Sequence, residues 1–378
     1  MSGPARPHDG LARALDLASG WVEERVVPGV AVAVARDGVI IAERYAGKRS
    51  AGGGGPVDAT TLYSVAAVTK PVTATLALRL VERGDLVLDE PVRRILPAFS
   101  DAAKREITPR HLLCHTSGLP QDDPALETLR QSEVDLAAIT ASALALDPVS
   151  PPGERVRYSN AAYWVLGAAL AAAGGASFAG LVQSEVLARF GLEESCFAPP
   201  AAAGERIARR YGAPKHLNTS YARALASPSG GLFATARDLV TFASLFLTGG
   251  SRPDATGVLS AASVTAMTTD QTGGLPGGID GFRTWPVCPW GLGWEVKGEK
   301  RHHWSGDFTS AATLSHIGQS GALLWADPAT GLACAILANR DLGSGWSFHP
   351  ARWARLSNAI CAVAVAVASA GTAATCRC

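Results

Sequence analysis

The stretch "AVTK", residues 67 to 70, places a lysine one helical turn after a position where a nucleophile could stand. Residues three apart share a helix face, so a nucleophile at position 67 would lie beside the ammonium group of Lys70. Such a lysine can lower the pKa of the nucleophile or, if burial has deprotonated it, accept its proton. Position 67 is Ala67, however, and alanine has no atom that can attack a carbonyl. The alternative is that Lys70 is an ordinary exposed helix lysine.

A second motif, Tyr158-Ser159-Asn160, stands where a loop leads into a helix. A tyrosine can relay a proton between a nucleophile and a leaving group, and an asparagine amide can hold both a lysine and a substrate carbonyl. The alternative is a helix N-cap made by Ser159 or Asn160.

A third motif, "HIGQSG" at residues 316 to 321, falls on a late strand. A glycine inside a strand indicates that another backbone or a ligand approaches closely, and the alternative is a bulge. The three motifs together, in this order, are much more specific than any one of them.

The elements that must position these motifs can be outlined from periodicity. Apolar spacing predicts a helix from Thr69 to about Gly84, with Pro71 in its first turn, which puts residue 67 at the helix N-terminus. Strands flank Asp37-Gly38 near the start. Strand-like segments follow one another after residue 290, and the region from 86 to 225 is helical with long loops. One antiparallel sheet assembled from the two chain ends, with a helical insertion, is therefore expected.

At this point the chain resembles the serine β-lactamase and penicillin-binding-protein-like superfamily, in particular its class C β-lactamase, esterase, D-aminopeptidase and transacylase branch. The resemblance runs from about residue 12 to 368 and includes the segments "VPGVAVAVARDG", "ITPRHLLCHTSGLP", "YSNAAYWVLG" and "GGLFATARDL". It implies an α/β fold with an antiparallel sheet flanked by helices (residues 1–85 and 226–378), an all-helical second domain (86–225) and an active site in the cleft between them.

The resemblance also assigns roles to residues. Position 67 would be the acylated serine, Lys70 its partner base and Tyr158 the proton relay. Substrate binding would fall to Asn160 and to the third motif, His316, Gly318 and Gln319. The backbone N–H groups of residues 67 and 319 would form an oxyanion hole.

Two departures from the family pattern matter. The nucleophile position is alanine, and no neighbour replaces it, since Ser64 precedes the helix and Thr69 lies about 200° around it. The third motif has His316-Ile317 where penicillin-recognising members often have Lys-Thr. A mostly neutral imidazole and an aliphatic side chain suit a substrate carboxylate poorly. We therefore expect a neutral ester, amide or thioester as acyl donor, with an amine or alcohol as an optional acceptor.

Composition excludes several classes of partner. Lys and Arg number 34 against 33 Asp and Glu, so no global field recruits nucleic acid or an anionic membrane. No secretory signal is recognised and the seven cysteines suit reduced thiols, so a cytoplasmic protein is expected. No cofactor is expected. A composition rich in Ala, Gly and Arg indicates a high-GC bacterium, where family members can serve in specialised-metabolite assembly, and this keeps transacylation beside hydrolysis.

Other chemistry-bearing residues have plainer alternatives. His111, Cys114 and His115 could form a metal-binding face, but they are expected to close a helix, and His302-His303 reads as a loop pair. Four tryptophans could wall an acyl pocket or simply pack together: Trp285, Trp290, Trp294 and Trp304.

Two interpretations follow. In the favoured one, the chain is an acyl-transferring serine hydrolase or transacylase whose serine has been replaced, by design, to trap a substrate complex, so that it is inactive or strongly impaired. In the alternative, it is a natural non-catalytic binding protein that uses the same cleft.

Overall fold

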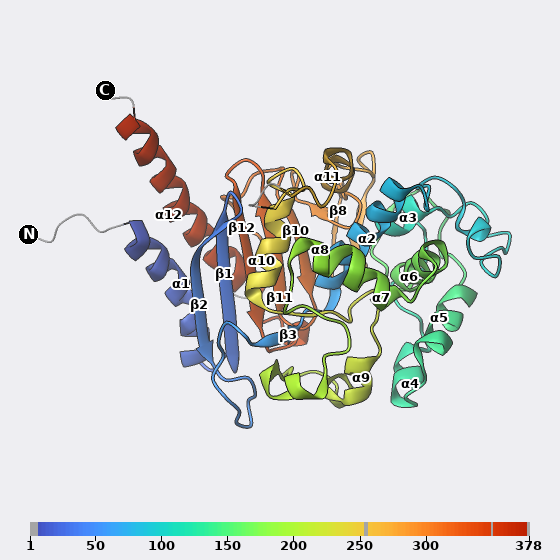
Figure 1. The fold of residues 1–378 in the computed structure, drawn as a ribbon, viewed down its shortest axis with the longest axis horizontal. Helices are drawn as coiled ribbons and strands as arrows, with labels where there is room; N and C mark the ends of the chain where they lie inside the picture. The colour runs from blue at the N-terminus through green and yellow to red at the C-terminus, as the bar shows by residue number, and fades with distance from the viewer. Residues whose placement is uncertain (1–6, 253–255, 349–350, 376–378) are drawn as a thin grey trace, which may run out of the picture.

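A six-stranded antiparallel sheet forms the centre of the computed structural model, which describes residues 7–252, 256–348 and 351–375. Its strand order is β2-β1-β12-β11-β10-β9, so the first two strands of the chain join the last four (Figure 1). The strands are β1 (Gly29–Arg36), β2 (Val39–Gly47), β9 (Glu295–Val296), β10 (Leu314–Gly318), β11 (Ala322–Asp327) and β12 (Leu332–Ala338). The prediction of one antiparallel sheet built from both chain ends is confirmed.

Turn chemistry sets two of the hairpins of this sheet. Asp37 and Gly38 both have positive φ, 47° and 83°, as a two-residue type I′ hairpin turn requires. Gly331, with φ 67°, ends the turn between β11 and β12. The turn at Asp37-Gly38 was predicted from its residues.

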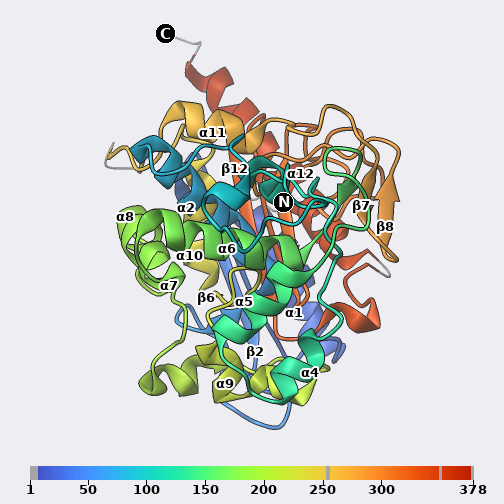
Figure 2. The same ribbon diagram turned by 90° about the vertical axis from the view of Figure 1, so that its right-hand side faces the viewer.

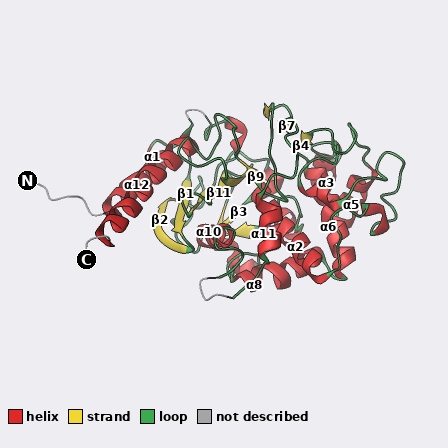
Figure 3. Cartoon of the chain, turned by 90° about the horizontal axis from the view of Figure 1, so that it is seen from above, coloured by secondary structure: helices red, strands yellow, loops and turns green. Residues whose placement is uncertain are grey.

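The two faces of the sheet are covered by different helices. Helices α1 (Pro7–Glu23) and α12 (Arg352–Thr375) lie side by side on one face (Figure 3). Helix α10 (Ala236–Leu245) covers the other face, and α2 (Thr69–Arg83) lies beyond it. In β1 the valines 30, 32 and 34 belong to the core under α1 and α12, and the alanines 31, 33 and 35 to the core under α10. This alternation is the period of two that a sheet buried on both faces needs.

The helical part follows β3 (Leu62–Ser64) and α2 and packs at the side of the sheet (Figure 2). Its helices are α3 (Pro109–Leu113), α4 (Leu126–Gln131), α5 (Leu136–Ala145), α6 (Asn160–Gly174), α7 (Phe178–Val182), α8 (Ala188–Phe190) and α9 (Ser220–Ala224). Short strands and one more helix complete the fold: β4 (Val156–Arg157), β5 (Ile207–Ala208), β6 (Phe233–Ala234), β7 (Gly277–Ile279), β8 (Arg283–Trp285) and α11 (Ala261–Thr268).

One strand-like segment forms less strand than expected. In "GLGWEVKG", residues 291 to 298, only Glu295–Val296 pairs in the sheet. Gly293 has φ 90°, and a Cβ at Gly291 would lie 2.0 Å from the carbonyl oxygen of Met267, so both glycines serve close loop packing.

The C-terminal helix α12 packs on the sheet through Trp353, Leu356 and Ile360, which are fully buried. The final Cys-Arg-Cys lies outside the described residues. Across the described ranges, no single helix is long and apolar enough to cross a bilayer, although the pair Asn160–Gly174 and Phe178–Phe190, bent by 74°, meets that test when taken together.

Candidate active site

A cleft of about 850 Å³ is lined by residues from both parts of the chain. Of the predicted site residues, Ala67, Tyr158, Asn160 and Gln319 line it directly. Lys70, His316 and Gly318 are not among the lining residues and lie behind its wall.

The turn before α2, which contains position 67, has an unusual backbone conformation. The short 3₁₀ helix η1 (Ala66–Val68) begins with Ala66 at φ 46°, a left-handed conformation that costs a non-glycine residue free energy. The Thr69 hydroxyl donates to the carbonyl oxygen of Ala66 at 2.7 Å and accepts from the amide of Leu232 at 3.1 Å. The strained turn is thus tied to the neighbouring chain, and the Thr69 hydroxyl is already engaged.

Lys70 is fully buried, so the reading of it as an exposed helix lysine is wrong. Its Nζ donates to Asn160 Oδ1 at 2.6 Å and to the carbonyl oxygen of Ser229 at 2.9 Å. A neutral amine has two N–H groups, which these two acceptors match, and it keeps a lone pair that can take a proton.

Electrostatics favour that neutral form. Burial lowers the pKa of Lys70 to about 7, and the nearby carboxylate of Asp122 only partly opposes this shift. Lys70 can therefore act as a base near neutral pH, which an ordinary lysine cannot.

Tyr158 lies beside this lysine and stays protonated. Lys70 Nζ is 4.8 Å from the centroid of the Tyr158 ring. Burial, with smaller contributions from Asp122 and Glu295, raises the pKa of Tyr158 above its ordinary value. The phenol is therefore suited to give or pass on a proton, while the lysine is the group that accepts one.

In the second motif, Ser159 makes the helix N-cap, while Asn160 contacts Lys70. Ser159 is the N-cap of α6, and its hydroxyl accepts from the amide of Ala162 at 2.9 Å. Asn160, the first residue of the helix, directs its Oδ1 at Lys70 and donates from Nδ2 to Asp122 at 2.8 Å. The cap fixes where the helix starts, and this places the side-chain amide of Asn160 between Lys70 and the carboxylate of Asp122.

Strand β10 approaches position 67 closely through Gly318. A Cβ on Gly318 would lie 2.2 Å from the carbonyl oxygen of Val65, so only glycine fits there. The amide nitrogens of Ala67 and Gln319 donate no hydrogen bond to any backbone group of the described residues. Two free N–H groups beside one cleft can stabilise a developing oxyanion.

His316 is 2% exposed and packs against the site from behind. Its ring centroid lies 6.1 Å from those of Tyr158 and Trp290, and its Nδ1 is 2.9 Å from the carbonyl oxygen of Ile317. Burial and the charge of Lys70 lower the pKa of His316 to about 3, so it is neutral. Ile317, not His316, presents its side chain to the cleft.

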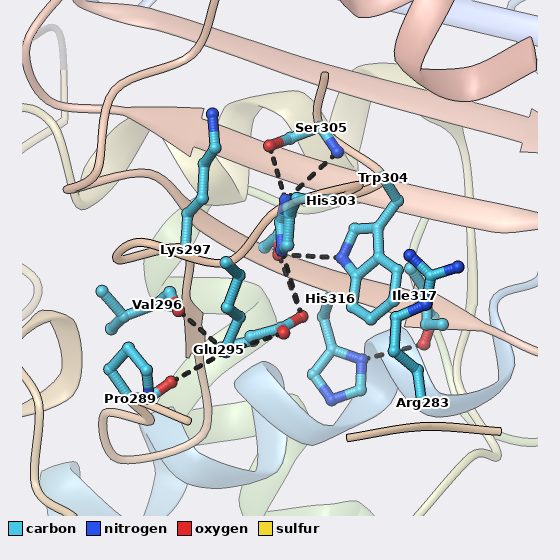
Figure 4. A network of polar contacts seen from close by, with 12 residues as sticks. Arg283, Pro289, Glu295, Val296, Lys297, His303, Trp304, Ser305, His316 and Ile317 are labelled. Carbon is cyan, nitrogen blue, oxygen red and sulfur yellow. Dashed lines mark hydrogen bonds and ion pairs between the residues drawn. The ribbon is translucent and has the colours of Figure 1, made fainter. Parts of the chain in front are cut away.

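A buried ionic network lies next to His316 (Figure 4). The carboxylate of Glu295 is 2.8 Å from Lys300 Nζ and 3.6 Å from His303 Nε2, and it accepts from the hydroxyl of Ser315 at 3.3 Å. Burial by itself raises the pKa of Glu295, but the charges of Lys300 and His303 outweigh it and lower the pKa to about 2. His302 and His303 lie in a loop, as expected, and the side chain of His303 is in addition part of this buried network.

Trp285 and Trp290 flank the ammonium of Lys300, which is 5.0 Å and 5.6 Å from their ring centroids. Trp294 stacks on Phe242 in the core, and Trp304 belongs to the core under α1 and α12. None of the four tryptophans lines the cleft, so packing is their role.

The two histidines near α3 have structural roles. His111 completes a capping box with Thr108, and His115 is buried 4.5 Å, ring to ring, from Tyr158. Among the described residues, no three His, Cys, Asp or Glu side chains are grouped to hold a metal ion.

Sequence reasoning missed Asp122, Ser229 and the network of Glu295, Lys300 and His303. Asp122 is 38 residues from Asn160 and the Ser229 carbonyl is 159 residues from Lys70, so no local spacing links them. The only signal was that Asp122 lies two residues after the end of the segment "ITPRHLLCHTSGLP".

The family model named Beta-lactamase matches residues 16–356. The chain belongs to the beta-lactamase family. It is 31% identical over 338 residues to penicillin-binding protein 4 of Amycolatopsis lactamdurans, covering 85% of this chain and 84% of that protein. Over a shorter stretch of 101 residues, 26% of each protein, it is 46% identical to esterase EstB of Burkholderia gladioli.

The fold is also that of solved members. The structure of EstCE1, described as a hydrolase with promiscuous acyltransferase activity, superimposes with a TM-score of 0.77 at 22% identity, covering 94% of this chain and 99% of that one. The predicted β-lactamase-like fold, an antiparallel sheet flanked by helices, is therefore confirmed.

Proposed function

We propose that this cleft is the acyl-transfer site of a β-lactamase-like serine enzyme, a hydrolase or transacylase, in which Ala67 occupies the place of the nucleophile. The observation that carries the proposal is the burial of Lys70, with two acceptors for its N–H groups and a pKa of about 7, one helical turn from position 67. A surface lysine would have neither this burial, nor these two acceptors, nor so low a pKa.

With a serine at position 67, the neutral Lys70 takes the hydroxyl proton as the oxygen attacks the acyl carbonyl. The negative charge then develops next to the amides of residues 67 and 319, each worth about 3 kcal/mol if well aimed. Tyr158, protonated and beside Lys70, passes a proton to the leaving group. Water then hydrolyses the acyl-enzyme, or an amine or alcohol accepts the acyl group.

With alanine at position 67, the same cleft binds an acyl donor but forms no acyl-enzyme. We infer a small-molecule ester, amide or thioester as donor, because the neutral His316 and the aliphatic Ile317 supply no cation for a carboxylate at the third motif. Ser64 also lines the cleft, but it precedes η1 and does not share the helix face of Lys70.

The decisive experiment is Ala67→Ser. Losing a nucleophile removes on the order of 10⁴ to 10⁶ in rate, so hydrolysis of short-chain nitrophenyl esters should rise by a comparable factor. The gain should vanish in Ala67→Ser combined with Lys70→Ala, the matched control, because an unactivated serine is a poor nucleophile. Adding an amine to the ester separates transfer from hydrolysis.

The second candidate is a non-catalytic binding protein, which Ala67 itself favours. Silence of a folded Ala67→Ser variant towards esters, amides and thioesters would support this candidate and overturn the acyl-transfer proposal.

A further inference from the structure

The cleft carries different chemistry at different places. Near the β7–β8 hairpin its wall carries apolar side chains beside Asp280 and Arg283: the rings of Phe282 and Phe348 lie 5.0 Å apart and both line the cleft, as does Ile317. Around α4 and α9, which lie side by side well away from that hairpin, the lining includes Arg130 (Figure 2). A substrate that fills the cleft therefore meets apolar side chains in one part and a guanidinium in another.

The other arginines of the cleft wall have direct contacts within the protein. Arg210 makes a bidentate ion pair with Asp341, at 2.8 and 2.7 Å, and both side chains are at most 10% exposed, so its charge is neutralised. The guanidinium of Arg283 donates one hydrogen bond, to the carbonyl oxygen of His302 at 2.6 Å, and this contact fixes its direction without neutralising its charge.

Arg130 differs from them. Within the described residues its guanidinium makes no hydrogen bond and no ion pair, although it has five N–H donors. Asp122 and Glu127 act on it only through longer-range attraction, and Arg210 repels it. Burial lowers the pKa of Arg130, and its half-buried side chain lines the cleft.

A half-buried guanidinium that has no partner gains from an anion that joins it. The fork of the guanidinium matches the oxygen pair of a carboxylate or phosphate, and such charge-assisted bonds are the strong ones. The nearby carboxylate of Asp122 accepts a hydrogen bond from Asn160 and makes none with Arg130.

This inference rests on the proposed function. We propose that the substrate carries an acidic group, a carboxylate or a phosphate, which Arg130 binds at the α4–α9 part of the cleft. The neutral acyl centre of the same substrate lies at position 67. This differs from carboxylate recognition at the third motif, because the cation belongs to α4 and not to β10.

Binding to the protein as it stands tests this directly, since Ala67 prevents turnover. Two matched pairs serve as probes: 4-nitrophenyl hydrogen glutarate against its methyl ester, and S-acetyl phosphopantetheine against S-acetyl pantetheine. Calorimetry should find the charged member of at least one pair bound more than about tenfold tighter, as a charged hydrogen-bonded contact predicts. The pair that shows the preference tells carboxylate from phosphate.

In Arg130→Met, which keeps the apolar stem of the side chain, the preference should fall to about one, with the affinity for the neutral member unchanged within about twofold. Arg130→Lys should keep part of it, and Arg105→Ala, an exposed arginine away from the cleft, should keep all of it. Circular dichroism checks that each variant is folded. Equal binding within both pairs, no saturable binding of either charged probe, or a preference that survives in Arg130→Met would each overturn the proposal.

The outcome is separable from that of Ala67→Ser. An Arg130-dependent preference for the charged probe together with a silent Ala67→Ser variant would refute acyl transfer and leave the anion site standing. Turnover of neutral esters by Ala67→Ser, with no preference for the charged probes, would refute the anion site and leave acyl transfer standing.

Discussion

At the scale of single residues, the site depends on what burial does to three titratable groups. Lys70, Tyr158 and His316 are all buried, and each is driven towards its neutral form. The lysine is the only one of them whose charge changes near neutral pH. The residue-level chemistry is therefore that of one base next to a protonated phenol and a neutral imidazole.

This makes the pH profile of the Ala67→Ser variant predictable. Below pH 7 Lys70 is protonated and cannot accept a proton, so kcat/KM should rise about tenfold per pH unit and level off above about pH 7. Asp122 raises the pKa of Lys70, so Asp122→Asn should move the midpoint to lower pH. A flat profile between pH 5 and 9, or a midpoint that moves upward, would show that Lys70 is not the base.

At the scale of elements, the site is made where β10 meets η1. The carbonyl oxygen of Val65 is 2.2 Å from where a Cβ of residue 318 would be, and Gln319 and Ala67, close to this contact in sequence, both line the cleft. In the neighbouring strand β9, Glu295 pairs with Lys300 of the following loop at 2.8 Å and accepts from Ser315 of β10 at 3.3 Å, so these contacts join β9, β10 and that loop.

Gly318→Ala should therefore damage function more than stability. In the Ala67→Ser background, displacing one oxyanion donor should lower kcat by about 10² to 10³-fold. The free energy of unfolding should fall by about 1 to 3 kcal/mol, as expected for an overpacked contact. Gly204→Ala is the control, since a Cβ there meets nothing within 4 Å and lies away from the cleft. Unchanged kcat in Gly318→Ala would exclude the Gln319 amide from the oxyanion hole.

At the scale of the whole molecule, the two ends of the chain are joined in one sheet. Asn339, just after β12, accepts from the amide of Gly29 at 2.7 Å and donates to the carbonyl oxygen of Lys48 at 3.1 Å. These contacts span 310 and 291 residues, so they form only when the whole sheet has assembled.

Removing the two hydrogen bonds of the Asn339 side chain should lower the stability of the whole molecule. Asn339→Ala leaves the buried amide of Gly29 without an acceptor, which should cost about 1 to 3 kcal/mol of unfolding free energy in urea denaturation. Asn218 is a matched control, because it also makes two hydrogen bonds to backbone, with Arg210, but over eight residues and half-exposed. Asn218→Ala should cost less, since water can replace its contacts. An equal loss in both variants would contradict a special role for the long-range link.

The sequence by itself determined the features that are encoded within a few residues. The Asp37-Gly38 hairpin, the helix after position 67, its Gly84 C-cap in the left-handed conformation, and the strand nature of residues 314–318 follow from turn chemistry and side-chain period. The absence of a nucleophile at Ala67 could likewise be read directly, because it depends on the identity of one side chain.

Only the tertiary structure decided which of these residues act together. Lys70 meets Asn160 across 90 residues and Ser229 across 159, and its pKa depends on that burial rather than on its neighbours in sequence. The same holds for Arg130, whose lack of a partner is visible only when α4 and the surrounding elements are in place. Burial, charge pairing and a pKa are properties of surroundings that distant segments create, so they arise only when the chain has folded.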